Sequence, residues 1–333
     1  MAYDEYMNRN LQRQGLPRAK AWLVRTISIL FALALMSSLA SCMGYVILPG
    51  VVRNVALVPP TYSDLPYASL SAAQKLDLYL PANGKGPFPL VILIHGGSFL
   101  AGDKANSGGL AGADPLLARG YAVASINYRF SNEALYPAQI FDAKAAVRFL
   151  RANSDQFQLD PERFAVFGDS AGGTLAALLG TTCGVEELEG PLLGNAAQSS
   201  CVQAVIDWYG PIDFLSIDTQ SAASDCPTNQ NDANSPTSLL VGAAIQTVPQ
   251  LVATTNAANY ITVDDASFLI EHGAMDCNVP PAQSKEFAQA LAKVIGTEKV
   301  TLVILQRAGH GGAPFLADAN ILRIIAFLNN SLR

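Results

Sequence analysis

Residues 167–173 are Phe167-Gly168-Asp169-Ser170-Ala171-Gly172-Gly173, which places one serine between two glycines in the pattern Gly-x-Ser-x-Gly. The run 163–167, apolar from Phe164 onward, predicts a buried strand before it, and residues 174–179 predict the first turns of a helix after it. The backbone must reverse between them, and glycines without a Cβ allow so tight a turn. We expect the Ser170 hydroxyl at the tip of the turn, beside the positive end of the helix dipole. A plain glycine-serine loop is the alternative.

The chain has three histidines, and a catalytic serine needs one of them as its base. His310 lies in a glycine-rich loop after the strand-like run 300–305, a place that suits a group that must take and return a proton. His272 ends the run 267–271 and fits a structural role better. His95 follows the run 90–94 and reads as a structural brace. His310 is therefore the predicted base.

One carboxylate, Asp276, lies in the loop 272–280 that follows the penultimate predicted strand. The order Ser170, Asp276, His310 is the order in which α/β-hydrolases carry their triad, and it differs from the orders in chymotrypsin and subtilisin. Asp276 is thus the predicted orienting acid. The alternative is an aspartate that caps the helix predicted to begin near Pro280.

A second glycine cluster supplies candidate donors for an oxyanion. The amides of Gly96 and Gly97, after the strand 90–94, can approach a ligand closely because glycine has no side chain. With the amide of Ala171 they would form a three-donor oxyanion hole. A plain Gly-Gly turn is the other interpretation.

Apolar runs and helical patterns alternate along the chain, which predicts a mostly parallel sheet with helices on both faces. The polar segment from about 212 to 262 has few apolar runs and is expected to cover part of the pocket as a small cap. The predicted strands are 76–80, 90–94, 122–127, 164–167, 202–209, 267–271 and 300–305. The predicted buried helix faces are Ile140, Ala143, Val147 and Leu150; Phe287, Leu291 and Val294; and Ile321, Ile324, Ile325 and Leu328.

These motifs, taken in order, resemble the hormone-sensitive-lipase-like branch of the α/β-hydrolases, and within it the carboxylesterase and lipase group of bifunctional feruloyl and acetyl xylan esterase-like proteins. The resemblance implies an α/β-hydrolase fold and runs from about residue 60 to the C-terminus. The loop before Asp276 lacks a second acidic residue next to its glycine, and Ser98 replaces a common third glycine; both bear on pocket shape. The matching segments are 76–81, 95–97, 127–129, 136–139 with Asp142, 160–161, 167–173, 207–211, 272–280 and 309–311.

Length and composition predict one catalytic domain, residues 51–333, after an N-terminal segment of residues 1–50. The net charge of -6, and a catalytic part without basic clusters, argue against a nucleic-acid partner. Neither a Cys/His spacing for zinc nor a Gly-x-Gly-x-x-Gly pattern for a dinucleotide is present, so no metal or cofactor is expected.

The N-terminal segment predicts export and association with a membrane. Basic residues precede an uncharged apolar stretch from Thr26 through Ala40, the pattern of a signal peptide or anchor with a cytoplasmic positive end. Residues 39–42 match a bacterial lipoprotein cleavage box, which would make Cys42 the lipid-carrying first residue. An uncut helix over 26–48 is the alternative. In both cases the catalytic domain is expected in the bacterial cell envelope, facing the periplasm or the exterior.

Export would place the catalytic domain in an oxidising compartment, where disulfides persist. Four cysteines, an even number, remain once Cys42 is set aside. Three pairings are possible. We favour Cys183 with Cys201, closing a loop between a helix and the next strand, and Cys226 with Cys277, tying the cap to the acid loop. Four free thiols are the alternative.

Three functions fit these residues. The first is a serine carboxylic ester hydrolase with an acyl-enzyme intermediate, for which the resemblance implies small acyl groups, such as acetyl or feruloyl, on carbohydrates. The second is an amide or formamide hydrolase of the arylformamidase kind, or a small peptidase, with the same triad. The third is a membrane-anchored binding protein with a silent site, which the complete triad argues against. In the first two the partner is a small molecule.

Overall fold

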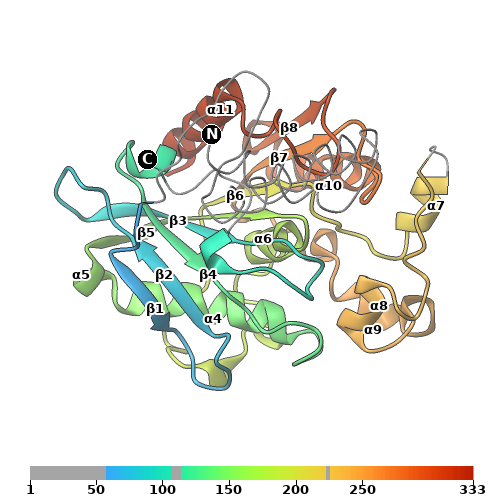
Figure 1. Ribbon diagram of the computed structural model, residues 1–333, viewed down its shortest axis with the longest axis horizontal. Helices are drawn as coiled ribbons and strands as arrows, with labels where there is room; N and C mark the ends of the chain where they lie inside the picture. Colours follow the sequence, from blue (N-terminus) through green and yellow to red (C-terminus); the bar gives the residue numbers. More distant parts are fainter. Residues whose placement is uncertain (1–57, 107–113, 223–225, 333) are drawn as a thin grey trace, which may run out of the picture. The chain divides into compact units, whose positions relative to one another are not determined.

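One sheet organises the described chain (Figure 1). The computed structural model describes residues 58–106, 114–222 and 226–332. The strands are β1 Tyr62–Pro66, β2 Lys75–Tyr79, β3 Phe88–Ile94, β4 Ala122–Ile126, β5 Leu159–Asp169, β6 Ala204–Trp208, β7 Ser267–Gly273 and β8 Val300–Leu305. Their order is β1-β2-β4-β3-β5-β6-β7-β8. The β2 strand is antiparallel to both its neighbours, and the pairings from β4 to β8 are parallel, as the alternating pattern predicts.

The β1 strand is the one that the sequence did not predict. It is an edge strand whose five residues are half-buried or exposed, so it carries no apolar run. The β5 strand also begins earlier than predicted, at Leu159, which pairs with Phe88 across a register shift. In both cases the residues are strands because they pair with neighbouring strands. The hydrophobic pattern within one segment does not reveal such pairing.

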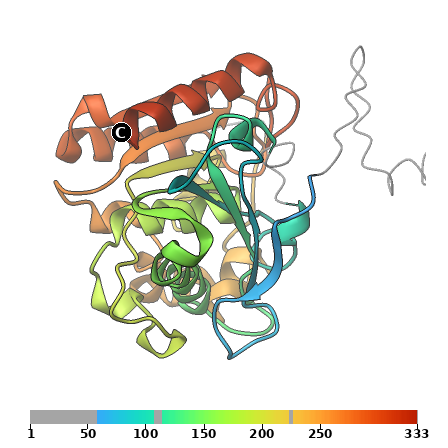
Figure 2. The ribbon, with the colours of Figure 1, turned by 90° about the vertical axis from the view of Figure 1, so that its left-hand side faces the viewer.

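Helices cover both faces of the sheet (Figure 2). The helices are α3 Asp114–Leu117, α4 Ala138–Ala152, α5 Ser154–Phe157, α6 Ala171–Thr181, α7 Ile217–Ala222, α8 Pro236–Val241, α9 Pro249–Ala253, α10 Ala282–Ile295 and α11 Asp318–Ser331. Short 3₁₀ turns are η1 Lys104–Asn106, η2 Glu186–Leu188, η3 Pro191–Leu193, η4 Ile245–Thr247, η5 Ala257–Tyr260 and η6 Thr297–Lys299. The buried side chains of α4, α6 and α10 pack on one face, and those of α3 and α11 on the other.

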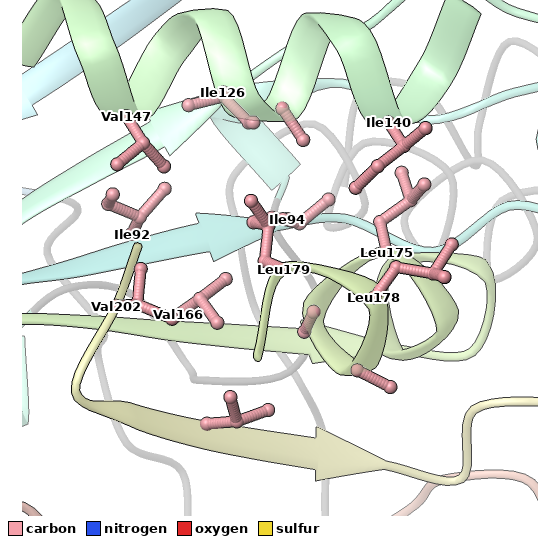
Figure 3. Packing of buried hydrophobic residues seen from close by; sticks show 14 of the residues in the cluster. Ile92, Ile94, Ile126, Ile140, Val147, Val166, Leu175, Leu178, Leu179 and Val202 are labelled. Carbon is pink, nitrogen blue, oxygen red and sulfur yellow. The ribbon is translucent and has the colours of Figure 1, made fainter. Parts of the chain in front are cut away.

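Side chains of the central strands divide between the two cores because successive residues point to opposite faces. In β3, Ile92 and Ile94 pack with the α4 and α6 side chains, as Figure 3 shows, while Val91 and Leu93 pack in the core of α3 and α11. A strand buried on both faces reads as the continuous apolar run that identified it.

The predicted helix faces are largely buried. All four predicted residues of α4 are buried, and in α11 Ile324, Ile325 and Leu328 are buried while Ile321 is half-buried. The prediction for Val294 of α10 is wrong, because this side chain is 39% exposed and Ile295 is buried instead. The buried row repeats every four residues, from Phe287 through Leu291 to Ile295, so it does not pass through Val294.

The segment 212–262 carries α7, α8 and α9, which lie together at one side of the sheet (Figure 1). Single apolar side chains, among them Phe214, Leu240 and Val252, anchor it in the same core as α4 and α6. Gln283, in the first turn of α10, holds the first residues of this segment in place. Its side-chain oxygen accepts the N–H groups of Ile212 and Asp213 at 2.8 and 2.7 Å.

The predicted N-terminal anchor and Cys42 lie outside the described residues. Within the part that the structure describes, we find no helix with the length and apolar character that a membrane crossing requires.

Candidate active site

Ser170 occupies the turn between β5 and α6 in a backbone conformation that few L-residues adopt, with φ 53° and ψ −119°. Its N–H donates to the carbonyl of Trp208 at 2.9 Å. A Cβ on Gly168 would lie 2.0 Å from the Gly172 carbonyl oxygen, and one on Gly172 would lie 2.1 Å from that of Ile94. The two glycines are therefore required by the close packing of the turn, as the Gly-x-Ser-x-Gly pattern indicates.

Ser170, His310 and Asp276 form one hydrogen-bonded chain. The Ser170 Oγ lies 2.8 Å from His310 Nε2, and His310 Nδ1 lies 2.7 Å from Asp276 Oδ2. Because an ionised carboxylate only accepts, Nδ1 carries the hydrogen, which leaves Nε2 to accept from the serine hydroxyl. Ser170 and His310 are 140 residues apart in the sequence, and Asp276 and His310 are 34 residues apart. The three side chains meet where β5, β7 and β8 end.

The Asp276 side chain is fully buried, and four donors surround it. Its Oδ1 accepts the backbone N–H groups of Asn278 and Val279 at 2.8 and 3.0 Å. Burial raises the pKa of this carboxyl, but hydrogen bonds from His272 and His310, the charge of His310 and the Val279 amide outweigh burial and hold the pKa well below its usual range. The carboxyl thus stays ionised at neutral pH. Its amide partners precede α10, whose N-cap is Pro281, so Asp276 does not cap that helix.

His272 lies against this acid, although the sequence indicated only a structural role. Its ring is fully buried, with Nε2 3.2 Å from Asp276 Oδ2 and 2.9 Å from the Val279 carbonyl oxygen, and Nδ1 2.7 Å from Ser284 Oγ. The position four residues before Asp276 was the available signal, but a core histidine at the end of a strand gives the same pattern.

His95 braces the loop after β3. It is buried, its ring stacks on Tyr128 with centroids 4.6 Å apart, and its Nδ1 donates to the Gly96 carbonyl at 2.7 Å. Burial lowers the pKa of His95, so the ring is neutral at neutral pH. This location fits the brace predicted from the sequence.

The structure corrects one of the three predicted oxyanion donors. The Gly96 N–H is directed to Asp169 Oδ1, 3.3 Å away, and Gly96 does not line the cavity. Gly97 and Ala171 do line it, and so does Ser98. Among the hydrogen bonds of the described residues, the amides of these three have no protein acceptor. The sequence could not show that the Asp169 side chain would take up the first glycine amide.

A cavity of about 600 Å³ opens in front of Ser170 and His310. Its lining includes apolar side chains, among them Phe99 and Ile217. The cap contributes a polar wall of Thr228, Asn229, Gln230 and Thr237, which Asn278 of the acid loop extends.

The carboxylate of Asp218 in α7 holds this wall in shape. It accepts the Thr228 hydroxyl at 2.7 Å and the backbone N–H groups of Gln230 and Asn231 at 2.6 and 2.8 Å. A loop wrapped on one carboxylate presents its side chains in a fixed arrangement.

Two disulfides join the pairs favoured from the sequence. Cys226–Cys277, with Cα atoms 5.1 Å apart, links the cap to the residue next to Asp276. Cys183–Cys201, with Cα atoms 4.9 Å apart, closes the loop between α6 and β6. The first lies at the cavity, because Cys277 is one of its lining residues.

Two further titratable groups lie beside the hydrogen-bonded chain. Burial raises the pKa of Asp169 to about 6, against the lowering effects of the Gly96 amide and His310. The Tyr209 ring lies 4.6 Å from that of His310, and burial with the nearby Asp169 and Asp276 raises its pKa. In the described part of the chain, no group of three or more His, Cys, Asp or Glu side chains could hold a metal ion.

Comparison with known proteins places this site in a family. The BD-FAE family model matches residues 76–291, which include Ser170 and Asp276. Esterase LipC of Mycobacterium tuberculosis is 30% identical over 250 residues, which are 75% of this chain and 58% of LipC. The chain thus spans less than two thirds of that relative.

Two solved structures share the fold. A truncated carbohydrate esterase from gut microbiota has a TM-score of 0.74 and 32% identity, covering 81% of this chain and 95% of that one. A bifunctional GH43-CE protein of Bacteroides eggerthii has a TM-score of 0.73 and 33% identity, covering 82% and 35%. With the family model spanning the sheet from β2 into α10, the chain belongs to the BD-FAE family of α/β-hydrolases.

Proposed function

We propose that this protein is a serine carboxylic ester hydrolase that works through an acyl-enzyme intermediate. The observation that carries the proposal is the hydrogen-bonded chain Ser170–His310–Asp276, of which Ser170 and His310 line the cavity. The relatives support ester hydrolysis, since LipC is named an esterase and the structural neighbour from gut microbiota a carbohydrate esterase.

In the first half-reaction, Ser170 Oγ attacks the ester carbonyl carbon while His310 Nε2 takes the hydroxyl proton. The carbonyl oxygen becomes an oxyanion that the amides of Gly97 and Ala171 hold, with Ser98 in the place first expected for Gly96. Such donors are typically worth about 3 to 4 kcal/mol each. The C–O bond then breaks, His310 returns the proton to the departing alcohol, and the acyl group stays on Ser170.

In the second half-reaction water takes the place of the alcohol. His310 removes a proton from the water, the hydroxide attacks the acyl carbon, and the proton returns to Ser170 Oγ as the acid leaves. Asp276 remains ionised throughout, because its four donors favour the charged form. Its role is to fix the His310 tautomer and to stabilise the imidazolium.

We infer that the substrates are short-chain esters, with acetyl or feruloyl esters of carbohydrates as the candidate class. The polar wall of Thr228, Asn229, Gln230 and Thr237 supports a hydroxylated alcohol group, because amide and hydroxyl side chains match hydroxyl partners. The apolar lining residues, among them Phe99 and Ile217, support a short acyl chain.

Export to the cell envelope with a membrane anchor is a further proposal. Both disulfides support it, because such bonds persist in oxidising compartments. The anchor itself rests on the sequence of residues 1–50.

The acyl-enzyme can be tested directly by mass spectrometry. Rapid quenching during turnover of p-nitrophenyl acetate should give a peptide acetylated on Ser170, and Ser170→Ala should give none. Turnover by Ser170→Ala at the wild-type rate would refute the mechanism. Faster cleavage of formanilides than of all esters would favour the formamide hydrolase alternative.

A further inference from the structure

The His272 ring connects α10 to the acid of the proposed triad. It sits near the end of β7, fully buried, between Ser284 Oγ on one side and Asp276 Oδ2 on the other. The Val279 carbonyl oxygen and an ionised Asp276 can only accept hydrogen bonds, so Nε2 must carry a hydrogen. In the neutral ring Nδ1 then accepts from the Ser284 hydroxyl.

This N–H also approaches the last acceptor position of the acid. A carboxylate offers about four lone-pair sites. Two backbone amides occupy Oδ1, and His310 Nδ1 occupies one site on Oδ2 at 2.7 Å. His272 Nε2 lies 3.2 Å from Oδ2, at the remaining site, and 2.9 Å from the Val279 carbonyl oxygen, so the two acceptors share its one N–H. Because the carboxylate is buried, without His272 no solvent would be positioned to replace this donor.

We propose that His272 is a positioning residue that, held by Ser284, fixes Asp276 Oδ2 on His310 Nδ1. The inference rests on the proposed function, since it concerns the base of that reaction. In this arrangement α10 orients the Asp276 carboxylate through a connected series of five side chains, which are Ser284, His272, Asp276, His310 and Ser170.

His272 also limits how strongly Asp276 acts on His310. An oxygen that accepts two N–H bonds is a weaker acceptor for each than an oxygen that accepts one. Loss of the His272 donor should therefore leave a stronger acceptor facing His310, stabilise its imidazolium form and move the acid limb of the pH profile to higher pH. The direction is specific, because loss of the carboxylate itself would move the limb the other way.

Other titratable groups face the same rings and must stay constant between variants. Asp169 and Tyr209 lie beside His310. Asp207 of β6 is the third such group; burial raises the pKa of Asp207 to about 6, against the lowering effects of the Gly210 amide and His272. None of these three is altered in the variants below.

Three variants test the proposal. His272→Leu removes both ring nitrogens, and His272→Gln can present an amide N–H near the position of Nε2. Asn320→Leu is the matched control. Asn320 is a buried neutral side chain that donates to the buried carboxylate of Glu271 at 2.7 Å, and Glu271 directly precedes His272 in the sequence. It removes a comparable bond without touching the proposed triad.

We expect His272→Leu to lower kcat by about 10- to 100-fold with KM within about twofold, as loss of one bond to a charged group implies. Its acid limb should lie at higher pH than that of the wild type. His272→Gln should recover most of kcat and the wild-type limb. Asn320→Leu should lower the melting temperature alone. The proposal would be overturned if His272→Leu and Asn320→Leu lost equal amounts of kcat. It would also be overturned if His272→Leu folded and kept the wild-type kcat and the wild-type acid limb.

A second measurement does not depend on turnover. With three histidines in the chain, ¹⁵N-histidine labelling gives a spectrum in which His272 should show the Nε2–H tautomer and His310 the Nδ1–H tautomer. A His272 ring without a hydrogen on Nε2 would overturn the inference even if His272→Leu failed to fold. Activity retained by Ser170→Ala would instead refute the proposed function and leave this spectrum unchanged.

Discussion

The backbone N–H of Gly96 donates to the carboxylate of Asp169 across 3.3 Å, which joins the loop after β3 to the residue before Ser170. Two segments that must stay in register for the proposed reaction, the oxyanion loop and the nucleophile turn, are thus held together by one side chain. Asp169 is half-buried, and its burial raises its pKa from 3.8 to about 6.

The raised pKa of Asp169 predicts a pH dependence of stability. Because the folded value exceeds the unfolded value, this residue favours the folded state below about pH 4, and that contribution is lost as the pH rises through about 6. We expect a change of roughly 1 to 2 kcal/mol in the free energy of unfolding, allowing for partial exposure. Asp169→Asn should remove it, and the surface variant Asp232→Asn should not. Urea titrations between pH 4 and 8 measure the difference; identical curves for wild type and Asp169→Asn would contradict it.

The proposed triad predicts that Ser170→Ala and His310→Ala each lower kcat by about three to six orders of magnitude, because members of a triad act as a unit. The double variant should lose little more than either single one. Ser199→Ala, on the loop between α6 and β6, serves as the control. Circular dichroism must show unchanged folding, and additive losses in the double variant would exclude a common step.

The two disulfides should contribute similarly to stability, but only one of them should matter for activity. Removing Cys226–Cys277 or Cys183–Cys201 by paired serine substitution should cost about 4 and about 3 kcal/mol of unfolding free energy, from loops of 51 and 18 residues. Only the first pair should lower kcat/KM, since only it lies at the cavity and beside Asp276. Equal kcat/KM for the two paired variants, measured well below their melting temperatures, would show that the cap link is not needed.

The cavity predicts a limit on acyl length. Each buried methylene gains roughly 0.8 kcal/mol until the space beside the apolar lining residues is full, and nothing thereafter. Specificity on p-nitrophenyl esters should therefore peak at acetyl to butyryl and fall beyond about eight carbons. Acetylated xylan, assayed in parallel, tests whether the alcohol part of the substrate is a carbohydrate, and methyl ferulate tests whether the acyl part can be an aromatic feruloyl group. Faster turnover of palmitoyl than of butyryl esters would make the protein a lipase instead.

The N-terminal segment predicts a processed lipoprotein. The mature chain should begin at a lipid-modified Cys42, and Cys42→Ser should leave a longer product in the membrane fraction. Intact mass spectrometry of the wild-type chain decides the question, because retention of residues 1–41 would favour the uncut helix.

Sequence alone found what depends on local pattern. Ser170 stands between glycines that the turn requires, and Asp276 and His310 follow predicted strands whose ends meet at one edge of a parallel sheet. Gly96 was assigned wrongly because the direction of its amide is set by Asp169, a residue far away in the sequence. The role of His272 was missed for the same reason: its partners Ser284 and Asp276 face it from another helix and another loop, and no periodicity records that.

The bond between Cys226 and Cys277 has a consequence for redesign. It joins the wall segment that begins at Thr228 to the residue after Asp276, so that any change widening the cavity from that wall also pulls on the acid. Attempts to evolve the protein toward bulkier substrates should therefore start at Ile217, which borders the cavity from α7 and lies farther along the chain from Cys226 than Thr228 does. Variation at Thr228 would trade new substrate range against the rate on every substrate.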